Sequence, residues 1–107
     1  MIGGNITAVI QQKSGASFNE IGEKVHEWVD VQTLWGWLDM SGGDYKYTYN
    51  AKLQESTHIF ICDYVEIDRN AGNKRMMVHD TAFDIVYIDD PMELHQHLEI
   101  YLRYVGR

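Results

Sequence analysis

The sequence predicts an all-β protein, a small closed β-barrel of about six antiparallel strands with one long loop between strands two and three. Apolar and polar side chains alternate along most apolar segments, turn residues separate these segments at hairpin spacing, and helical periodicity is almost absent. A chain of 107 residues is expected to form a single domain, 1–107, which buries roughly two-thirds of its unfolded surface around one core.

A wide hairpin turn joins the first two predicted strands. Ile6–Gln12 alternates apolar and polar residues and forms the first of these strands. The following segment, Lys13–Lys24, is rich in Ser, Gly and Asn, which are typical of turns. A short helix within Asn19–Lys24 is an alternative, although Gly22 weakens it.

The strongest strand signal covers Trp28–Leu38, which has large apolar side chains on both faces. At period two, Val29, Val31, Trp35 and Trp37 share one face, while Trp28, Leu34 and Leu38 share the other. We expect the barrel core to cover one face and a neighbouring subunit the other, although each tryptophan alone could belong to an ordinary core. Gly36 indicates a bulge or a close backbone approach. The candidate subunit or partner contacts are Trp28, Trp35 and Trp37.

The second half of the chain supplies the remaining strands. They are predicted at Thr57–Tyr64, Lys74–His79, Phe83–Asp89 and His97–Val105. A tight turn is expected at Asp80-Thr81-Ala82 and one helical turn within Met92–Gln96. The residues predicted to contribute to the core are Val29, Val31, Ile59, Ile61, Ile85, Ile88, Leu98 and Ile100.

The longest connection, Asp39–Ser56, is the candidate functional segment, because long loops in compact domains are usually functional or disordered. Tyr45, Tyr47 and Tyr49 alternate with polar residues, so an extended chain places three phenol rings on one side. A helix that starts after a cap at Asp44 is the alternative local structure. The alternative to a functional segment is an ordinary surface loop without a specific role.

Charge and cysteine content restrict the partners. Sixteen acidic and nine basic residues give a formal charge of −7, which argues against tight phosphate binding. It is compatible with a surface that passes close to nucleic acid and repels it. The single cysteine, Cys62, excludes an internal disulfide and favours an intracellular origin. No apolar run approaches the ~20 residues of a membrane span, so we expect a soluble protein with no membrane partner.

Catalytic and metal-binding motifs find little support in the sequence. His95 and His97 could bring two imidazoles together, but the spacing of histidines and Cys62 matches no zinc signature. Carboxylates such as Asp89 and Asp90 more often cap turns than bind cations. Nucleotide-binding loops and nucleophile elbows are absent from the sequence. We therefore predict a protein that is not an enzyme, with no catalytic residues, no metal and no cofactor.

The order of these features resembles the head completion proteins (head closure or head–tail connector proteins) of long-tailed bacteriophages over nearly the whole chain. The most specific stretch runs from Asp89-Asp90-Pro91 to Gly106. Two positions depart from the family pattern: Asp63-Tyr64 replaces a frequent Arg-Tyr pair, and Asp80-Thr81-Ala82 lacks a glycine. The other matching features, individually weak, are carried by Glu27–Val31, Tyr45–Gln54, Tyr64, Lys74–Val78, Ile88–Pro91 and Leu98–Leu102.

This resemblance implies a structural virion protein that forms a ring under the portal–adaptor end of the head, after assembly in the host cytoplasm. Its implied partners are other copies of itself, the portal-adaptor protein, the tail-completion or tail terminator protein, and packaged double-stranded DNA held without sequence-specific binding. The ring would dock the tail, and the long loops would meet in the channel as a stopper. The implied stopper residues are Asp44, Tyr45, Lys46, Tyr47, Thr48, Tyr49, Asn50, Lys52, Leu53 and Gln54.

Three other classes of protein remain as alternatives. A tail-completion protein or another small morphogenesis barrel at the head–tail joint would bind the tail tube instead of the portal-adaptor. A ligand-binding or enzymatic barrel would need a deep pocket with converging polar groups. An acidic DNA mimic is a weaker match, because nine basic residues are interspersed among the acidic ones.

Overall fold

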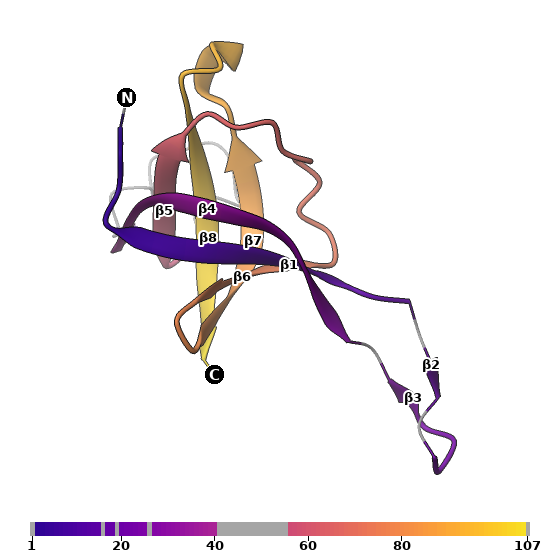
Figure 1. Cartoon of the computed structure of the whole chain (residues 1–107). Coiled ribbons are helices and arrows are strands. Elements are labelled where there is room, and N and C mark those ends of the chain that lie inside the picture. Colours follow the sequence, from indigo (N-terminus) through magenta and orange to yellow (C-terminus); the bar gives the residue numbers. More distant parts are fainter. Residues whose placement is uncertain (1, 16, 19, 26, 41–55, 107) are drawn as a thin grey trace.

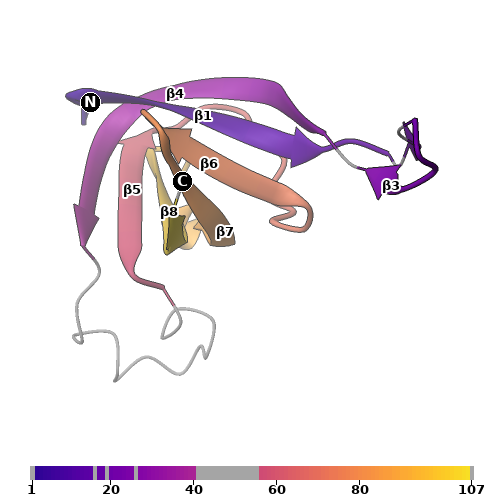
Figure 2. The same cartoon turned by 90° about the horizontal axis from the view of Figure 1, so that it is seen from below.

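Six antiparallel strands form a closed barrel in the order β1-β4-β5-β8-β7-β6, as predicted (Figures 1 and 2). The structure is a computed structural model that describes residues 2–15, 17–18, 20–25, 27–40 and 56–106. The ring closes where β1 pairs with β6. The barrel strands are β1 (Ile6–Lys13), β4 (Trp28–Met40), β5 (His58–Asp63), β6 (Lys74–Val78), β7 (Thr81–Asp89) and β8 (His97–Gly106).

The barrel interior is filled by apolar side chains from all six strands. Phe60 of β5 lies opposite Leu38 on one side and Ile100 on the other, so this row of paired residues crosses the core. Cys62 is buried on the same face as Phe60. The predicted core positions Ile85, Ile88, Leu98 and Ile100 are confirmed.

Of the other four predicted core positions, Ile59 is confirmed as buried, whereas Val29, Val31 and Ile61 were wrong. Val29 and Val31 are each 50% exposed, because they lie at the end of β4 that extends past the barrel. Ile59 is buried but lies outside the core cluster, and Ile61 is only half-buried. In β5, the residues that alternate with Phe60 and Cys62 point to the outer wall. The error was therefore one of strand face.

Three register shifts interrupt the strand pairing, and none was predicted. The first lies in β8, where Gly106 pairs with Ala82 and Tyr104 pairs with Phe83, which leaves Val105 as the extra residue. In β4, Gln32 pairs with Ile10 and Asp30 pairs with Gln11, which leaves Val31 as the extra residue. In β7, Ile85 pairs with Leu102 and the next pair is Tyr87 with Tyr101. The extra residue there, Val86, explains how Ile85 and Ile88 both reach the core although they are an odd number of residues apart.

Gly36 marks a close backbone approach, one of the two outcomes that the sequence predicted. A Cβ at Gly36 would lie 2.3 Å from the carbonyl oxygen of Ile61 and 2.8 Å from the Phe60 ring. Gly4 crosses over the same point, and a Cβ there would lie 2.5 Å from the Gly36 backbone. The first described residues can therefore pass this close over β4 because position 4 is glycine, whereas Gly36 is required by its close approach to β5.

The connections differ from their predicted forms in three places. The predicted wide turn contains a small hairpin of β2 (Ser17–Phe18) and β3 (Lys24–Val25), and the described residues of this segment form no helix. The β6–β7 turn is His79-Asp80, so Thr81 and Ala82 belong to β7. His79 has a φ of 56°, a value that usually requires glycine.

The predicted helical turn is a single 3₁₀ turn, η2 (Pro91–Glu93), which starts one residue earlier than expected. Within the described ranges, no helix is long and apolar enough to cross a bilayer.

Candidate assembly surfaces

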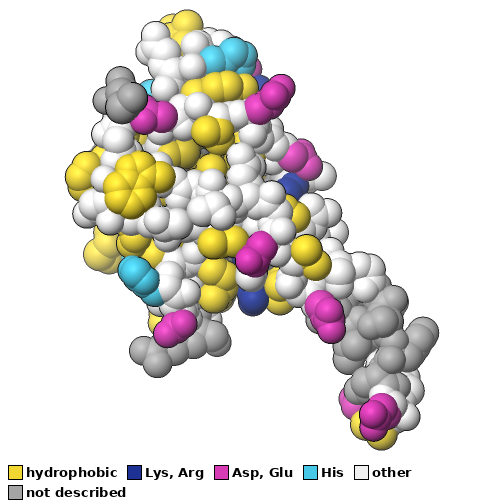
Figure 3. All heavy atoms as spheres, in the orientation of Figure 1, with side chains coloured by type: hydrophobic (Ala, Val, Ile, Leu, Met, Phe, Trp, Pro, Cys, Tyr) yellow, Lys and Arg dark blue, Asp and Glu magenta, His cyan; other side chains and the backbone are white. Residues whose placement is uncertain are grey.

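The outer side of β4 presents large aromatic side chains to solvent. Trp35 is 55% exposed and Trp37 is 44% exposed, although both belong to the strand with the strongest apolar pattern. Both side chains point outward, because the intervening Gly36 and the neighbouring Leu34 are buried. Figure 3 shows hydrophobic side chains gathered on the face of the barrel where β1 and β4 run. Exposed aromatic groups of this size indicate a contact surface.

Trp28 lies on this same outer face, because the bulge at Val31 reverses the alternation of β4. It was predicted on the opposite face from Trp35. Beyond the bulge, Asp30 pairs with Gln11, and Gln11 pairs in turn with Arg75 of β6. The Arg75 guanidinium stands 4.3 Å from the centre of the Trp28 ring. We call the outward side chains of Trp28, Trp35 and Trp37 the tryptophan wall.

A polar network supports one end of the tryptophan wall. The Arg75 Nε–H donates to Gln11 Oε1 at 2.8 Å, and Gln11 Nε2 donates to Asp30 Oδ1, also at 2.8 Å. Among the described arginines, Arg69 and Arg103 pair with carboxylates, whereas the bonded partner of Arg75 is a neutral amide. Arg75 therefore keeps a positive charge available beside the Trp28 ring.

Asp63 anchors the N-terminal segment at the other end of the wall. Its carboxylate accepts hydrogen bonds from the backbone N–H groups of Ile2 and Gly3. These two bonds hold the pKa of Asp63 below its ordinary value. The Trp37 indole N–H donates to the Ile2 carbonyl at 3.2 Å. Asp63 thus has a structural role in this chain.

The β7–β8 connection is a short loop held by two pairs of side chains. Arg69 binds Glu93 through two N–H···O bonds of 2.8 Å each. The buried Asp90 carboxylate accepts hydrogen bonds from the backbone N–H and the Nδ1 of His95. Burial alone would raise the pKa of Asp90, but the bonds from His95 lower it below its ordinary value. The loop projects beyond the barrel and exposes Met92.

Among the described residues, one group of possible metal-binding donors lies in this loop, although the sequence predicted no metal site. Single donor atoms of Asp90, Glu93 and His95 lie within 4.8 Å of one another. Each of them already has a hydrogen-bond partner in the protein, so these side chains hold the loop together without a metal ion. We call the bonds between Asp90 and His95 the clasp. His97, which the sequence placed beside His95 as a possible co-ligand, bonds Glu99 at 2.9 Å on β8.

Cys62 is not chemically activated. Burial, followed by the charge of Asp63, raises the pKa of the thiol to about 11. A thiol with this pKa is protonated at neutral pH and is a poor nucleophile and a poor metal ligand.

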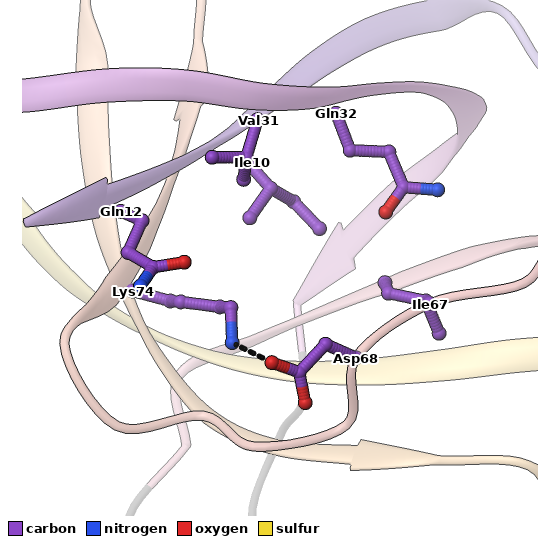
Figure 4. Close-up of a pocket in the computed structure, with 7 residues that line it drawn as sticks. All are labelled: Ile10, Gln12, Val31, Gln32, Ile67, Asp68 and Lys74. Atoms are coloured by element: carbon purple, nitrogen blue, oxygen red, sulfur yellow. Dashed lines mark hydrogen bonds and ion pairs between the residues drawn. The ribbon is translucent and has the colours of Figure 1, made fainter.

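A small cavity opens at the end of the barrel near Lys74 (Figure 4). Its volume is about 160 Å³, below the ≈ 300–1,000 Å³ of typical ligand pockets. The buried Lys74 ammonium donates to Asp68 Oδ2 at 3.0 Å and to the Asn70 carbonyl at 2.6 Å, so a carboxylate already balances its charge. This cavity is too small and too well neutralised to support the ligand-binding alternative, and the larger hollow of about 410 Å³ at Lys13, Ser14, Gly15 and Asn73 is wide open to solvent. The cavity is lined by Ile10, Gln12, Val31, Gln32, Ile67, Asp68 and Lys74.

The ten predicted stopper residues, Asp44 to Gln54, lie outside the described residues, but both flanks of their loop are placed. Met40 and His58 form the last pair between β4 and β5. On the second flank, the Thr57 N–H donates to the Leu102 carbonyl at 2.7 Å, and Thr57 Oγ1 accepts from the Tyr104 N–H at 2.8 Å. Both flanks of the loop are therefore held by backbone pairing and hydrogen bonds at one rim of the barrel.

An aromatic cluster lies at this same rim, and sequence reasoning did not find it. The His58 and Phe83 rings have centroids 5.0 Å apart, and those of Phe83 and Tyr104 are 5.9 Å apart in a T-shaped arrangement. The three residues come from β5, β7 and β8, so only the register of the closed barrel brings them together.

Asp90→Asn is expected to lower the melting temperature at neutral pH and to reduce its fall in acid. The pKa of Asp90 is lower in the folded protein than its ordinary value of 3.8. The ionised carboxylate therefore stabilises the fold at any pH above 3.8. This stabilisation is lost as the pH falls below 3.8 and through the pKa of the folded state. Thermal melts of both proteins should therefore converge towards about pH 2. Glu66→Gln, at an exposed carboxylate, serves as the control. If the melting temperatures of wild type and Asp90→Asn change with pH in parallel, the bonds between Asp90 and His95 do not stabilise the fold.

Comparisons with known proteins identify a matching family and two similar structures. Residues 5–103 match the model of a family described as phage head completion protein. The fold resembles the solution structure of protein SF1141 from Shigella flexneri 2a, with a TM-score of 0.69, 20% identity, and coverage of 97% of this chain and 95% of that one. It also resembles a chain in the virion of a native gene transfer agent particle, with a TM-score of 0.53, 13% identity, and 96% coverage of each chain. No curated protein sequence matches the chain.

Proposed function

Because the chain belongs to the phage head completion protein family, a family of structural virion proteins, we propose that it forms a ring at the head–tail junction. In this proposal the ring closes the DNA channel and offers the docking surface for the tail. The observation that carries the proposal is the tryptophan wall, an exposed aromatic surface on a barrel that buries apolar side chains from all six strands.

The barrel requires other copies of itself to surround DNA. Its interior is filled by packed side chains, so a channel can only lie between subunits. A head-to-tail ring uses two different patches on each subunit, and the tryptophan wall supplies one of them. A contact centred on Trp35 has the character of an interface hot spot, because tryptophan contributes strongly when a partner desolvates it.

The proposed gate is the loop Asp39–Ser56. It leaves the barrel between neighbouring strands β4 and β5, so its two ends return to one rim. In a ring with this rim turned towards the axis, loops of adjacent subunits meet and can pair through their backbones. The net charge of −7 disfavours binding to phosphate, which lets DNA slide past the ring when the gate opens.

The proposed partners follow from this position in the particle. One side of the ring contacts the portal-adaptor protein and the other contacts the tail-completion or tail terminator protein. Packaged double-stranded DNA passes through the centre without sequence-specific contacts. The ring is added to heads in the host cytoplasm and remains in the virion.

DNA retention tests the proposal directly. Heads assembled without this protein should lose packaged DNA to nuclease, and addition of the purified protein should restore protection. Bovine serum albumin at the same concentration is the control for non-specific protection. Heads that retain DNA equally well without the protein would overturn the proposed function.

Trp35→Ser is expected to leave the barrel folded and to reduce incorporation into heads by about tenfold or more, as expected for a hot-spot residue. Because the side chain is 55% exposed in the monomer, the melting temperature should change little. Quantitative mass spectrometry of purified heads gives the copy number. Val105→Ser on β8, with 52% exposure, is the matched control, and equal incorporation of both variants would exclude the tryptophan wall as an interface.

A further inference from the structure

The β2–β3 hairpin forms an arm that stands away from the barrel. We define the arm as the described residues of the segment 14–27. Its two strands pair with each other, and within the described chain neither joins the barrel sheet. Both views of the molecule show the arm extending past the ends of β1 and β4, clear of the barrel wall (Figures 1 and 2).

The base of the arm is held by reciprocal hydrogen bonds. The Ser14 N–H donates to the Glu27 carbonyl at 2.7 Å, and the Glu27 N–H donates to Ser14 Oγ at 3.0 Å. The neighbouring Lys13 N–H donates to the Asn73 carbonyl at 2.8 Å. These bonds fix the direction in which the arm leaves the barrel. An isolated two-stranded hairpin is only marginally stable in water, so this arm is suited to lie against another surface.

The tip of the arm combines an aliphatic group with negative charge. Its turn is Glu20-Ile21-Gly22-Glu23, and Gly22 supplies the φ of +85° that the turn needs. Ile21 is 79% exposed. A surface that fits this tip must offer an apolar platform with a positive charge beside it.

The tryptophan wall has this complementary chemistry. Trp28 provides a partly exposed ring, and the guanidinium of Arg75, whose hydrogen-bond partner is neutral, stands 4.3 Å from the centre of that ring. The arm cannot reach the wall of its own barrel, because it leaves the ends of β1 and β4 and points away. The two surfaces lie at different places on one chain, which is the requirement for a head-to-tail contact.

We propose that the arm of one copy lies across the tryptophan wall of the next copy in the ring, with Ile21 on Trp28 and the tip glutamates facing Arg75. The proposal rests on the proposed ring and names its lateral contact. A heterologous contact of this kind repeats from subunit to subunit, so every arm and every wall in a closed ring is occupied.

Photo-crosslinking in assembled heads tests the contact. The photoreactive residue p-benzoylphenylalanine replaces Ile21, and irradiation should give a ladder of covalent multimers of this chain. Peptide mapping should place the attachment within β4 or β6 of a second copy. Attachment to a different protein would overturn the proposal, as would the absence of a ladder in heads whose ring is visible by electron microscopy. Heads that show no ring at all would instead remove the proposed function together with the arm contact.

Charge exchange tests the pairing independently. Arg75→Glu alone and the double variant Glu20→Lys with Glu23→Lys should each reduce incorporation by about tenfold, because like charges then face each other. Combining all three substitutions should restore incorporation to near the wild-type level. Thermal melts check that the barrel of each variant is folded. Lys24→Glu, a change of charge elsewhere in the arm, is the control for the effect of charge alone on incorporation. Failure of the combined variant to recover, while it is folded, would contradict the contact.

Discussion

Heads that carry a ring with Tyr45–Gln54 replaced by a short Gly-Ser linker are expected to package DNA and then lose it. The barrel should remain folded, because long surface loops add little closure entropy. Its melting temperature should stay within a few degrees of wild type. The ring should still assemble, since the proposed lateral contacts lie on the tryptophan wall and the arm. Infectivity should fall almost completely.

Two further measurements make this loop prediction specific. Changing Tyr45, Tyr47 and Tyr49 to Ser should give partial leakage, in proportion to the rings that contact neighbouring loops. Replacing arm residues 20–23 with Gly-Ser should instead reduce ring incorporation, which separates closure from assembly. Full, stable heads made with the shortened loop would refute the stopper. A barrel that unfolds without the loop would show that this segment belongs to the core.

Gly36→Ala is expected to have the largest effect on stability. The added Cβ would lie 2.3 Å from the Ile61 carbonyl oxygen and 2.9 Å from the Cys62 Cβ, so the paired backbone of β5 must shift. Overpacking of this kind costs about 1–3 kcal/mol or more. For a domain of this size, the loss corresponds to a fall in melting temperature on the order of 10 °C. Thermal and urea denaturation followed by circular dichroism measure both quantities.

Gly15→Ala is the matched control for this substitution. A Cβ at Gly15 would meet no atom within 4 Å, so the same chemical change should have a small effect there. Gly4→Ala should be intermediate, because the N-terminal segment that crosses Gly36 can move outward more easily than a barrel strand. Equal melting temperatures for Gly36→Ala and Gly15→Ala would contradict the close approach seen in the structure.

The strands were predictable because their pattern is local, whereas the faces they present depend on register. Alternation located all six barrel strands to within about two residues. The bulge at Val31 could not be predicted, because an extra residue is recognised only from the partner strand. It brings Trp28 onto the same face as Trp35 and Trp37, whereas the sequence had placed Trp28 on the opposite face.

The site was predictable to a smaller extent. Exposed tryptophans follow from a strand that is apolar on both faces, and the long loop follows from the spacing of its flanking strands. The arm was missed because its strands are two residues each, too short for any periodic signal. The Asp90–His95 clasp was missed because its geometry depends on the positive φ of Glu93 and His95, which neither residue type predicts.

Electron microscopy of the purified protein mixed with portal–adaptor complexes from the same source tests the central claim most directly. The account predicts a closed ring of barrels under the adaptor, with the β4–β5 rim turned towards the axis and density from residues 39–56 across the channel. The tryptophan wall of each barrel should be covered by its neighbour. Portal complexes that bind no ring, or a ring with this rim turned outward and an open channel, would contradict the account.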